Sequence, residues 1–140
     1  MLEVYTENSS GIATLVDEAI IFNNKVLQTG CTATANMPTN TVRLNRAGFY
    51  SVHLDAVIAN NTAEEGLVGI QLYNNNDEVS NAYTAQTSTG NTNLVSVGFD
   101  AIVQVRPSCA VINNTANLQF KVANNNAMVY FANVVVTKIA

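Results

Sequence analysis

The stretch LNRAGFYSVHLDAVI, residues 44–58, decides the fold, because its alternation predicts a strand with two unequal faces. The first face is apolar and carries Tyr50, Val52, Leu54, Ala56 and Ile58. The second face is mixed and carries Phe49, Ser51, His53, Asp55 and Val57. A strand with one solvated face would be polar along that face. We therefore expect the second face, with Phe49 and Val57 on it, to meet another protein surface.

The rest of the chain follows the same pattern of short strands and turns. Runs of asparagine separate apolar stretches, and asparagine favours turns because it tolerates the left-handed backbone conformation. The strands that we expect are residues 18–24, 41–44, 48–58, 66–73, 79–86, 93–106, 117–122 and 128–139. No helical period separates them, so the pattern predicts an all-β, antiparallel jelly-roll sandwich of about 8–10 strands. A single domain is expected over residues 1–140.

Composition and charge argue against several classes of partner. The net charge is −4 and the chain has only six lysine and arginine residues. A nucleic-acid surface or an anionic membrane would require a basic patch, so neither is an expected partner. No apolar run approaches the roughly 20 residues of a membrane span. The start, MLEVYTENSS, lacks the pattern of a signal peptide, so we expect synthesis in the cytosol or prior removal of a signal.

The candidate chemical groups favour structural roles over catalysis. Ser51, His53 and Asp55 share one strand face, but neighbours at i and i+2 lie about 7 Å apart, too far for a tight catalytic relay. No enzyme activity, metal or cofactor is therefore expected. Cys31 and Cys109 are expected to be two buried thiols rather than a disulfide, and a single histidine leaves them short of a zinc site.

Four segments, taken in order, resemble a known family. They are AIIFNN, VRLNRAGFYSVHLDAVI, GIQLYNNNDEV and the closing FANVVVTKIA. Val42, Gly48 and Tyr50 are similar to the F-x-x-P-x-x-G-x-Y motif that opens the long inner strand in the tumour necrosis factor and complement globular-head superfamily. Val42 replaces the phenylalanine of the motif and Asn45 the proline. The closing VVVTKIA is similar to the last strand of bacteriophage and spore-surface members.

The resemblance implies a homotrimer whose long inner strand faces the threefold axis. The mixed face of residues 48–58 would then meet two copies of itself, together with the second face of residues 93–106. The trimer-interface residues implied are Phe49, Ser51, His53, Asp55, Val57, Ser96, Asp100 and Ile102. Three copies of His53 near one axis would repel each other when protonated, so its folded pKa is expected below the unfolded value unless Asp55 compensates.

Two functions remain open. The first is a virion structural protein of a bacteriophage, a trimeric capsid decoration or head-fibre protein. It would be made in the host cytoplasm, bind a capsid or other virion protein and lie on the virion surface. The alternative is an extracellular or cell-surface recognition module that binds a glycan or a receptor through its loops. The collagen stalk and the acidic calcium loop of complement members are missing, which argues against a cytokine or complement role.

The segment of residues 1–17 has two alternative roles. It carries a short apolar run with Leu2, Val4 and Tyr5, followed by a turn signal. It could be one more strand, paired with residues 19–23, that completes the jelly roll. Alternatively it could be an attachment segment that adds to a sheet edge of a neighbouring virion protein.

Overall fold

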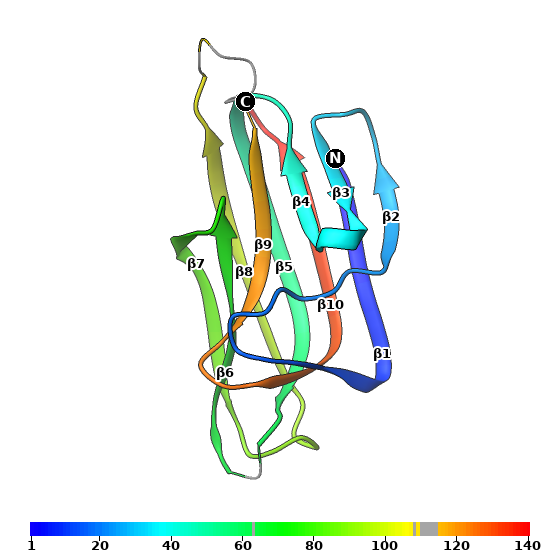
Figure 1. Ribbon diagram of the computed structural model, residues 1–140, viewed down its shortest axis with the longest axis vertical. Helices are drawn as coiled ribbons and strands as arrows, with labels where there is room; N and C mark the ends of the chain where they lie inside the picture. Colours follow the sequence, from blue (N-terminus) through cyan, green and yellow to red (C-terminus); the bar gives the residue numbers. More distant parts are fainter. Residues whose placement is uncertain (63, 108, 110–114) are drawn as a thin grey trace.

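The computed structural model describes residues 1–62, 64–107, 109 and 115–140. They form a sandwich of two five-stranded antiparallel sheets, which confirms the predicted all-β jelly roll (Figure 1). Sheet A has the order β2-β1-β10-β5-β8, and sheet B has the order β3-β4-β9-β6-β7. The elements are β1 (Leu2–Thr14), β2 (Asn24–Gln28), β3 (Ala33–Asn36), the 3-10 helix η1 (Met37–Thr39), β4 (Thr41–Leu44), β5 (Gly48–Asn60), β6 (Gly66–Asn74), β7 (Asp77–Ser88), β8 (Val95–Val105), β9 (Ala116–Ala123) and β10 (Ala127–Lys138).

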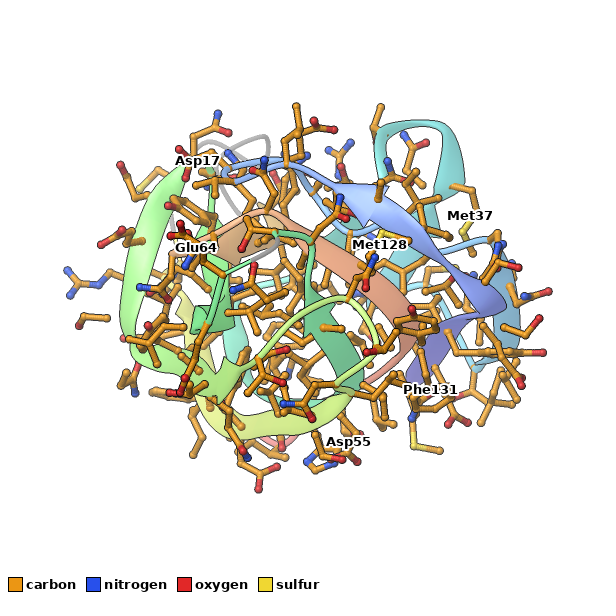
Figure 2. All side chains as sticks on the ribbon, turned by 90° about the horizontal axis from the view of Figure 1, so that it is seen from below. Asp17, Met37, Asp55, Glu64, Met128 and Phe131 are labelled. Carbon is orange, nitrogen blue, oxygen red and sulfur yellow. The ribbon has the colours of Figure 1, made fainter. Side chains whose placement is uncertain are left out.

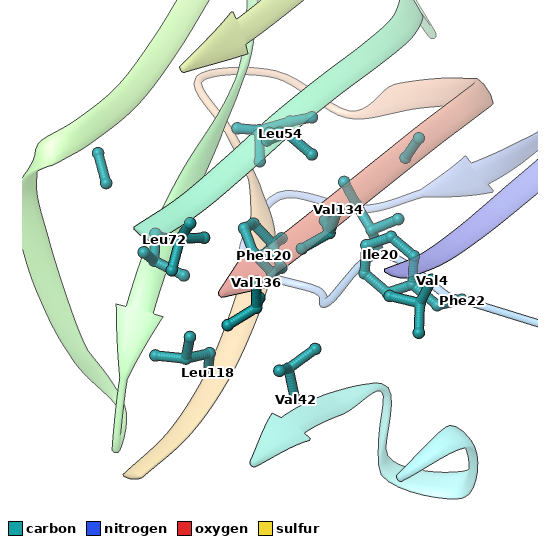
Figure 3. Close-up of a cluster of buried hydrophobic side chains, with 14 of the residues drawn as sticks. Val4, Ile20, Phe22, Val42, Leu54, Leu72, Leu118, Phe120, Val134 and Val136 are labelled. Carbon is teal, nitrogen blue, oxygen red and sulfur yellow. The ribbon is translucent and has the colours of Figure 1, made fainter. Parts of the chain in front are cut away.

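The core lies between the sheets and is built by the alternation seen in the sequence. Phe120 of β9 occupies its centre, with the ring of Phe22 at 5.9 Å and the ring of Phe99 at 6.2 Å. Figure 3 shows the side chains from both sheets that meet there, including Leu54 and Val134 of sheet A and Leu72 of sheet B. Each of these strands therefore directs one face inward, so its other face is left for solvent or a partner.

Among the described non-glycine residues, asparagine supplies four of the five with a positive φ. Asn75 and Asn76 have φ values of 51° and 70° and form the two-residue turn between β6 and β7. Asn124, at φ 74°, follows β9. These conformations are strained for most residues, but asparagine tolerates them. The interpretation of these asparagine runs as turns is confirmed at both places.

The entry to β5 explains the motif of Gly48 and Tyr50. The Tyr50 ring is fully buried, and its hydroxyl donates a hydrogen bond of 2.7 Å to the carbonyl oxygen of Arg46. Gly48 has a φ of 144°, and a Cβ atom there would collide with the carbonyl oxygen of Ala140. The turn before β5 thus requires glycine at position 48, and the hydrogen bond of the Tyr50 hydroxyl to Arg46 fixes the shape of this turn.

The N-terminal segment differs from the expectation about its partner. Residues 2–14 form β1, which pairs with β10 on one side and with β2 on the other. The predicted strand over residues 18–24, the proposed partner, was wrong. That segment crosses to sheet B, where the amide of Ile20 donates to the carbonyl oxygen of Phe120 and Ala19 forms a single bridge with Lys121. Ile20 and Phe22 are buried, so burial alone produced the strand-like alternation.

The two cysteines also differ from the expectation. Both Cys31 and Cys109 are exposed and neither forms a disulfide. Cys31 lies in the connection between β2 and β3, where its carbonyl oxygen accepts a hydrogen bond of 2.8 Å from the Asn45 side chain. Cysteine is usually buried, but outside the strands no alternation directs a side chain inward. The prediction of two buried thiols was wrong for this reason.

Candidate assembly face on sheet A

The outward face of sheet A, named here the assembly face, gathers every residue that was predicted for the trimer interface. β5 lies between β10 and β8, and its register places His53 opposite Asp100, Ser51 opposite Ile102 and Val57 opposite Ser96. Directly opposed residues in an antiparallel pair point to the same side of the sheet. Phe49, Ser51, His53, Asp55 and Val57 therefore share one face with Ser96, Asp100 and Ile102. Their role in assembly stays a prediction.

Apolar side chains lie at both ends of the assembly face. At one end Ile102 is 58% exposed and Phe49 is 41% exposed. Ile139 lies next to Phe49, because its main-chain amide donates a hydrogen bond to the carbonyl oxygen of Phe49. At the opposite end Phe131 of β10 lies across from Val57. Large apolar side chains gathered on one exposed face usually mark an interaction surface.

The contribution of β1 and β10 to this face was missed. His53 of β5 lies opposite Val135 of β10, which in turn lies opposite Glu3 of β1. In the same way Asp55 lies opposite Asn133, and Asn133 lies opposite Tyr5. Figure 2 shows Asp55 and Phe131 on the same side of the molecule. The sequence of residues 131–136 did indicate this contribution, because apolar side chains occur there at both odd-numbered and even-numbered positions and therefore on both faces of the strand.

His53 forms the polar centre of the assembly face. Its Nε2 lies 2.7 Å from Oδ2 of Asp55, and its Nδ1 contacts Oδ1 of Asp100. The hydrogen bond that the His53 ring donates to Asp100, followed by the one it donates to Asp55, raises the pKa of His53 above its usual value. Within the protomer the pKa is raised because Asp100 and Asp55 both stabilise the imidazolium, so the compensation by Asp55 that the expectation allowed for is present. The effect of three copies near one axis stays a prediction.

The same geometry bears on the candidate triad. Both ring nitrogens of His53 are engaged by carboxylates. A histidine that activates a serine uses one ring nitrogen as the base and the other for orientation. Neither nitrogen is left for the hydroxyl of Ser51, so the arrangement suits a fixed, charged cluster rather than nucleophilic catalysis.

His53 is expected to stabilise the protein on the acidic side. A raised folded pKa means that this contribution is fully present below the unfolded pKa of about 6.5 and is lost as the pH rises through the folded pKa. The group is more than a third exposed, so solvent screening limits the effect to about 0.2–1 kcal/mol. The melting temperature of wild type should therefore be higher than that of His53→Gln at about pH 5.5, and the two melting temperatures should be equal near about pH 8.5.

The single histidine makes this test direct. Its imidazole signals can be titrated by NMR without assignment, and the midpoint should lie above about 6.5. Asp100→Asn should lower that midpoint, since Asp100 makes the largest contribution to the raised pKa. A midpoint at or below the ordinary value in wild type would contradict the two-carboxylate arrangement.

Other candidate sites are sparse in the described part of the chain. Among residues 1–62, 64–107, 109 and 115–140, no group of three or more histidine, cysteine or acidic side chains is placed to hold a metal ion. No helix in these residues has the length and apolar character that crossing a bilayer requires.

The two sheets, with their strand order and the long β5 in sheet A, define a jelly roll of the tumour necrosis factor type. The structure of Eiger TNF from S. frugiperda shares this fold, with a TM-score of 0.70 at 14% identity over 99% of this chain and 92% of the other. PRD1 vertex protein P5 matches with a TM-score of 0.64 at 15% identity over 99% and 96%. Murine APRIL at pH 5.0 matches with a TM-score of 0.64 at 12% identity over 99% and 98%.

At these identities the likeness concerns the fold. No family model matches the sequence, and no curated protein matches it.

Proposed function

We propose that this protein is a non-enzymatic structural component of a virus particle, a homotrimer that serves as a capsid decoration or head-fibre protein of a bacteriophage. The observation that carries the proposal is the assembly face. It is a broad sheet face with apolar side chains at both ends and a charged cluster at its centre, on the side opposite the core.

The apolar side chains on this face are better explained if the face is buried in a trimer than if it is exposed to water in a monomer. In one protomer Phe49, Ile102 and Ile139 are each more than 40% exposed. Burying them against two further copies would remove this apolar surface from water, which stabilises assembly by about 25 cal/mol for each Å² buried. The central His53, Asp55 and Asp100 would meet their symmetry mates near the axis, so the protonated histidine would offset part of the acidic charge.

The virion role is supported by the shared fold of PRD1 vertex protein P5, which matches over nearly the whole of both chains. A decoration or fibre protein acts by presenting a stable folded surface, and this needs no catalytic site. In this proposal the protein is made in the host cytoplasm, lies on the virion surface and binds a capsid or other virion protein. Nucleic acid and membrane are not partners, because basic side chains are few.

The proposal predicts both an oligomeric state and a location. Light scattering at micromolar concentration should give about three times 15.0 kDa. Purified particles from the source should carry the protein, visible by electron microscopy as threefold projections. A clean monomer would contradict the trimer, and particles that lack the protein would contradict the virion role.

The second candidate is a recognition module at an extracellular or cell surface. It is favoured by a separate observation, a polar groove on the outward face of sheet B that is lined by amide and hydroxyl side chains. Binding on a glycan array, by a protein that does not co-purify with capsids, would favour this candidate over the structural one.

A further inference from the structure

The groove on sheet B lies on the side of the sandwich opposite the assembly face. It has a volume of about 390 Å³, within the range of small-ligand sites. β4 and β9 form its floor, and the turn between β6 and β7 and the segment around η1 form its walls. The lining side chains that matter for its chemistry are Asn36, Thr41, Arg43, Asn76, Asn117 and Gln119.

One main-chain bond and two bonds that involve a side chain hold the walls of the groove to its floor. Asn75 and Asn117 exchange two bonds of 2.9 Å, one between their main chains and one from the Asn117 amide to Oδ1 of Asn75. On the other side, the side chain of Gln119 donates to the carbonyl oxygen of Thr39 at 3.4 Å. Arg43 and Asn117 are paired across β4 and β9. The groove is therefore built largely on the sheet rather than on a free loop.

Several polar groups in the groove have no partner within the described residues. Arg43 forms no ion pair with any carboxylate that the structure describes, and the described residues lining the groove include no acidic side chain. The side-chain amides of Asn36, Asn76 and Asn117 likewise make no hydrogen bond inside the described part of the chain. Asn75 differs, because its side chain is used in fixing the turn.

From this geometry we infer that the groove binds a saccharide that carries a carboxylate, such as a sialic or uronic acid residue. Amide side chains both donate and accept, so they match the hydroxyl groups of a sugar. Arg43 is the one charged side chain among the described lining residues, and a guanidinium can bond a carboxylate through two parallel hydrogen bonds. The inference deepens the second candidate function and is independent of the virion role.

The lining also predicts that a single groove binds weakly. Its described lining residues include no aromatic side chain against which a sugar ring could stack. Tyr73 is opposite Gln119 in the sheet, but the ammonium of Lys121 already lies 4.5 Å from the centre of its ring. In the proposed trimer, sheet B faces outward, so three grooves would act together and raise the effective affinity for a repeating polysaccharide.

Saturation-transfer NMR and a glycan array on the intact wild-type protein test this inference. The probes are sialyllactose, an oligosaccharide that contains glucuronate, and the neutral sugars lactose and maltohexaose. At least one acidic probe should bind, and better than both neutral sugars. The comparison between the two acidic probes identifies which acid the groove prefers.

Three variants locate the binding. Arg43→Gln should weaken binding of the acidic probe by about tenfold or more, because it removes a charge-assisted bond. Asn117→Asp, which is nearly isosteric, should do the same by placing a negative charge in the groove. Arg46→Gln is the matched control, since Arg46 is exposed and lies outside the lining, and it should bind as wild type. All three should keep the wild-type melting temperature.

Other results would overturn the inference in distinguishable ways. Glycan binding that neither Arg43→Gln nor Asn117→Asp weakens would retain the recognition function and place its site elsewhere. Equal loss in Arg46→Gln would show a general charge effect and no groove site. Absence of binding to any saccharide would remove both the groove site and glycan recognition, and would leave the structural role on the particle untouched.

Discussion

Ile102→Asp should convert the trimer into a monomer at micromolar concentration. The side chain of Ile102 is 58% exposed in the protomer, opposite Ser51 on the assembly face and on the same strand as Asp100. In the proposed trimer the substitution would bury a carboxylate in each protomer, close to the carboxylates that already flank His53. An unpaired buried charge costs several kcal/mol, and the threefold symmetry imposes it three times. Size-exclusion chromatography with light scattering measures the change directly.

The matched control is Leu67→Asp. Leu67 of β6 is 47% exposed, which is close to Ile102, but it belongs to sheet B. Leucine and isoleucine are isomers and both are replaced by aspartate. A general effect of replacing an exposed apolar side chain by a charge would therefore appear in both variants. The control should remain a trimer. A trimeric Ile102→Asp, or a monomeric Leu67→Asp, would contradict the placement of the interface on sheet A.

Alternation in the sequence was enough to predict most of the strands, because it reports which side chains face the core. Residues 41–44 were placed with the bounds of β4, and residues 48–58 fall within β5. The same signal misled at residues 18–24, where Ile20 and Phe22 are buried without a strand ladder. Burial and hydrogen-bond pairing are separate properties, and a single sequence reports mainly the first. β2 shows the converse, since all of its residues are exposed and no alternation revealed it.

The assembly face could be predicted strand by strand, but the contacts within it could not. Ser51, His53 and Asp55 are neighbours on one strand, so their common face follows from the period of two. Asp100 is 47 residues from His53, and only the register between β5 and β8 brings the two side chains together. Two strands and their turn separate β5 from β8 in the chain, so no short turn reveals that register. The contribution of Asp100 to the raised pKa of His53 could therefore not be predicted from the sequence.

Removing residues 1–10 should abolish cooperative folding of the protein. β1 lies between β10 and β2, so its loss would expose the edge of β10 and leave β2 without a partner. Leu2, Val4 and Thr6 are each no more than 1% exposed. Leu2 and Val4 belong to the hydrophobic core, so they are unavailable as an anchor while β1 stays in the sheet. Circular dichroism of the truncated chain should show no cooperative melting transition, and the protein should aggregate through the freed edge.

Two single substitutions test whether β1 stabilises the protein through the packing of its buried side chains. Leu2→Ala should lower the free energy of unfolding by about 2–5 kcal/mol, because it leaves a cavity in the core. Glu7→Ala changes an exposed side chain of the same strand and should change it by less than about 0.5 kcal/mol. The alternative for this segment, attachment to the particle, predicts a different result. A truncated protein that melts like wild type but no longer binds the particle would make residues 1–10 an anchor, and would show that the sandwich closes without β1.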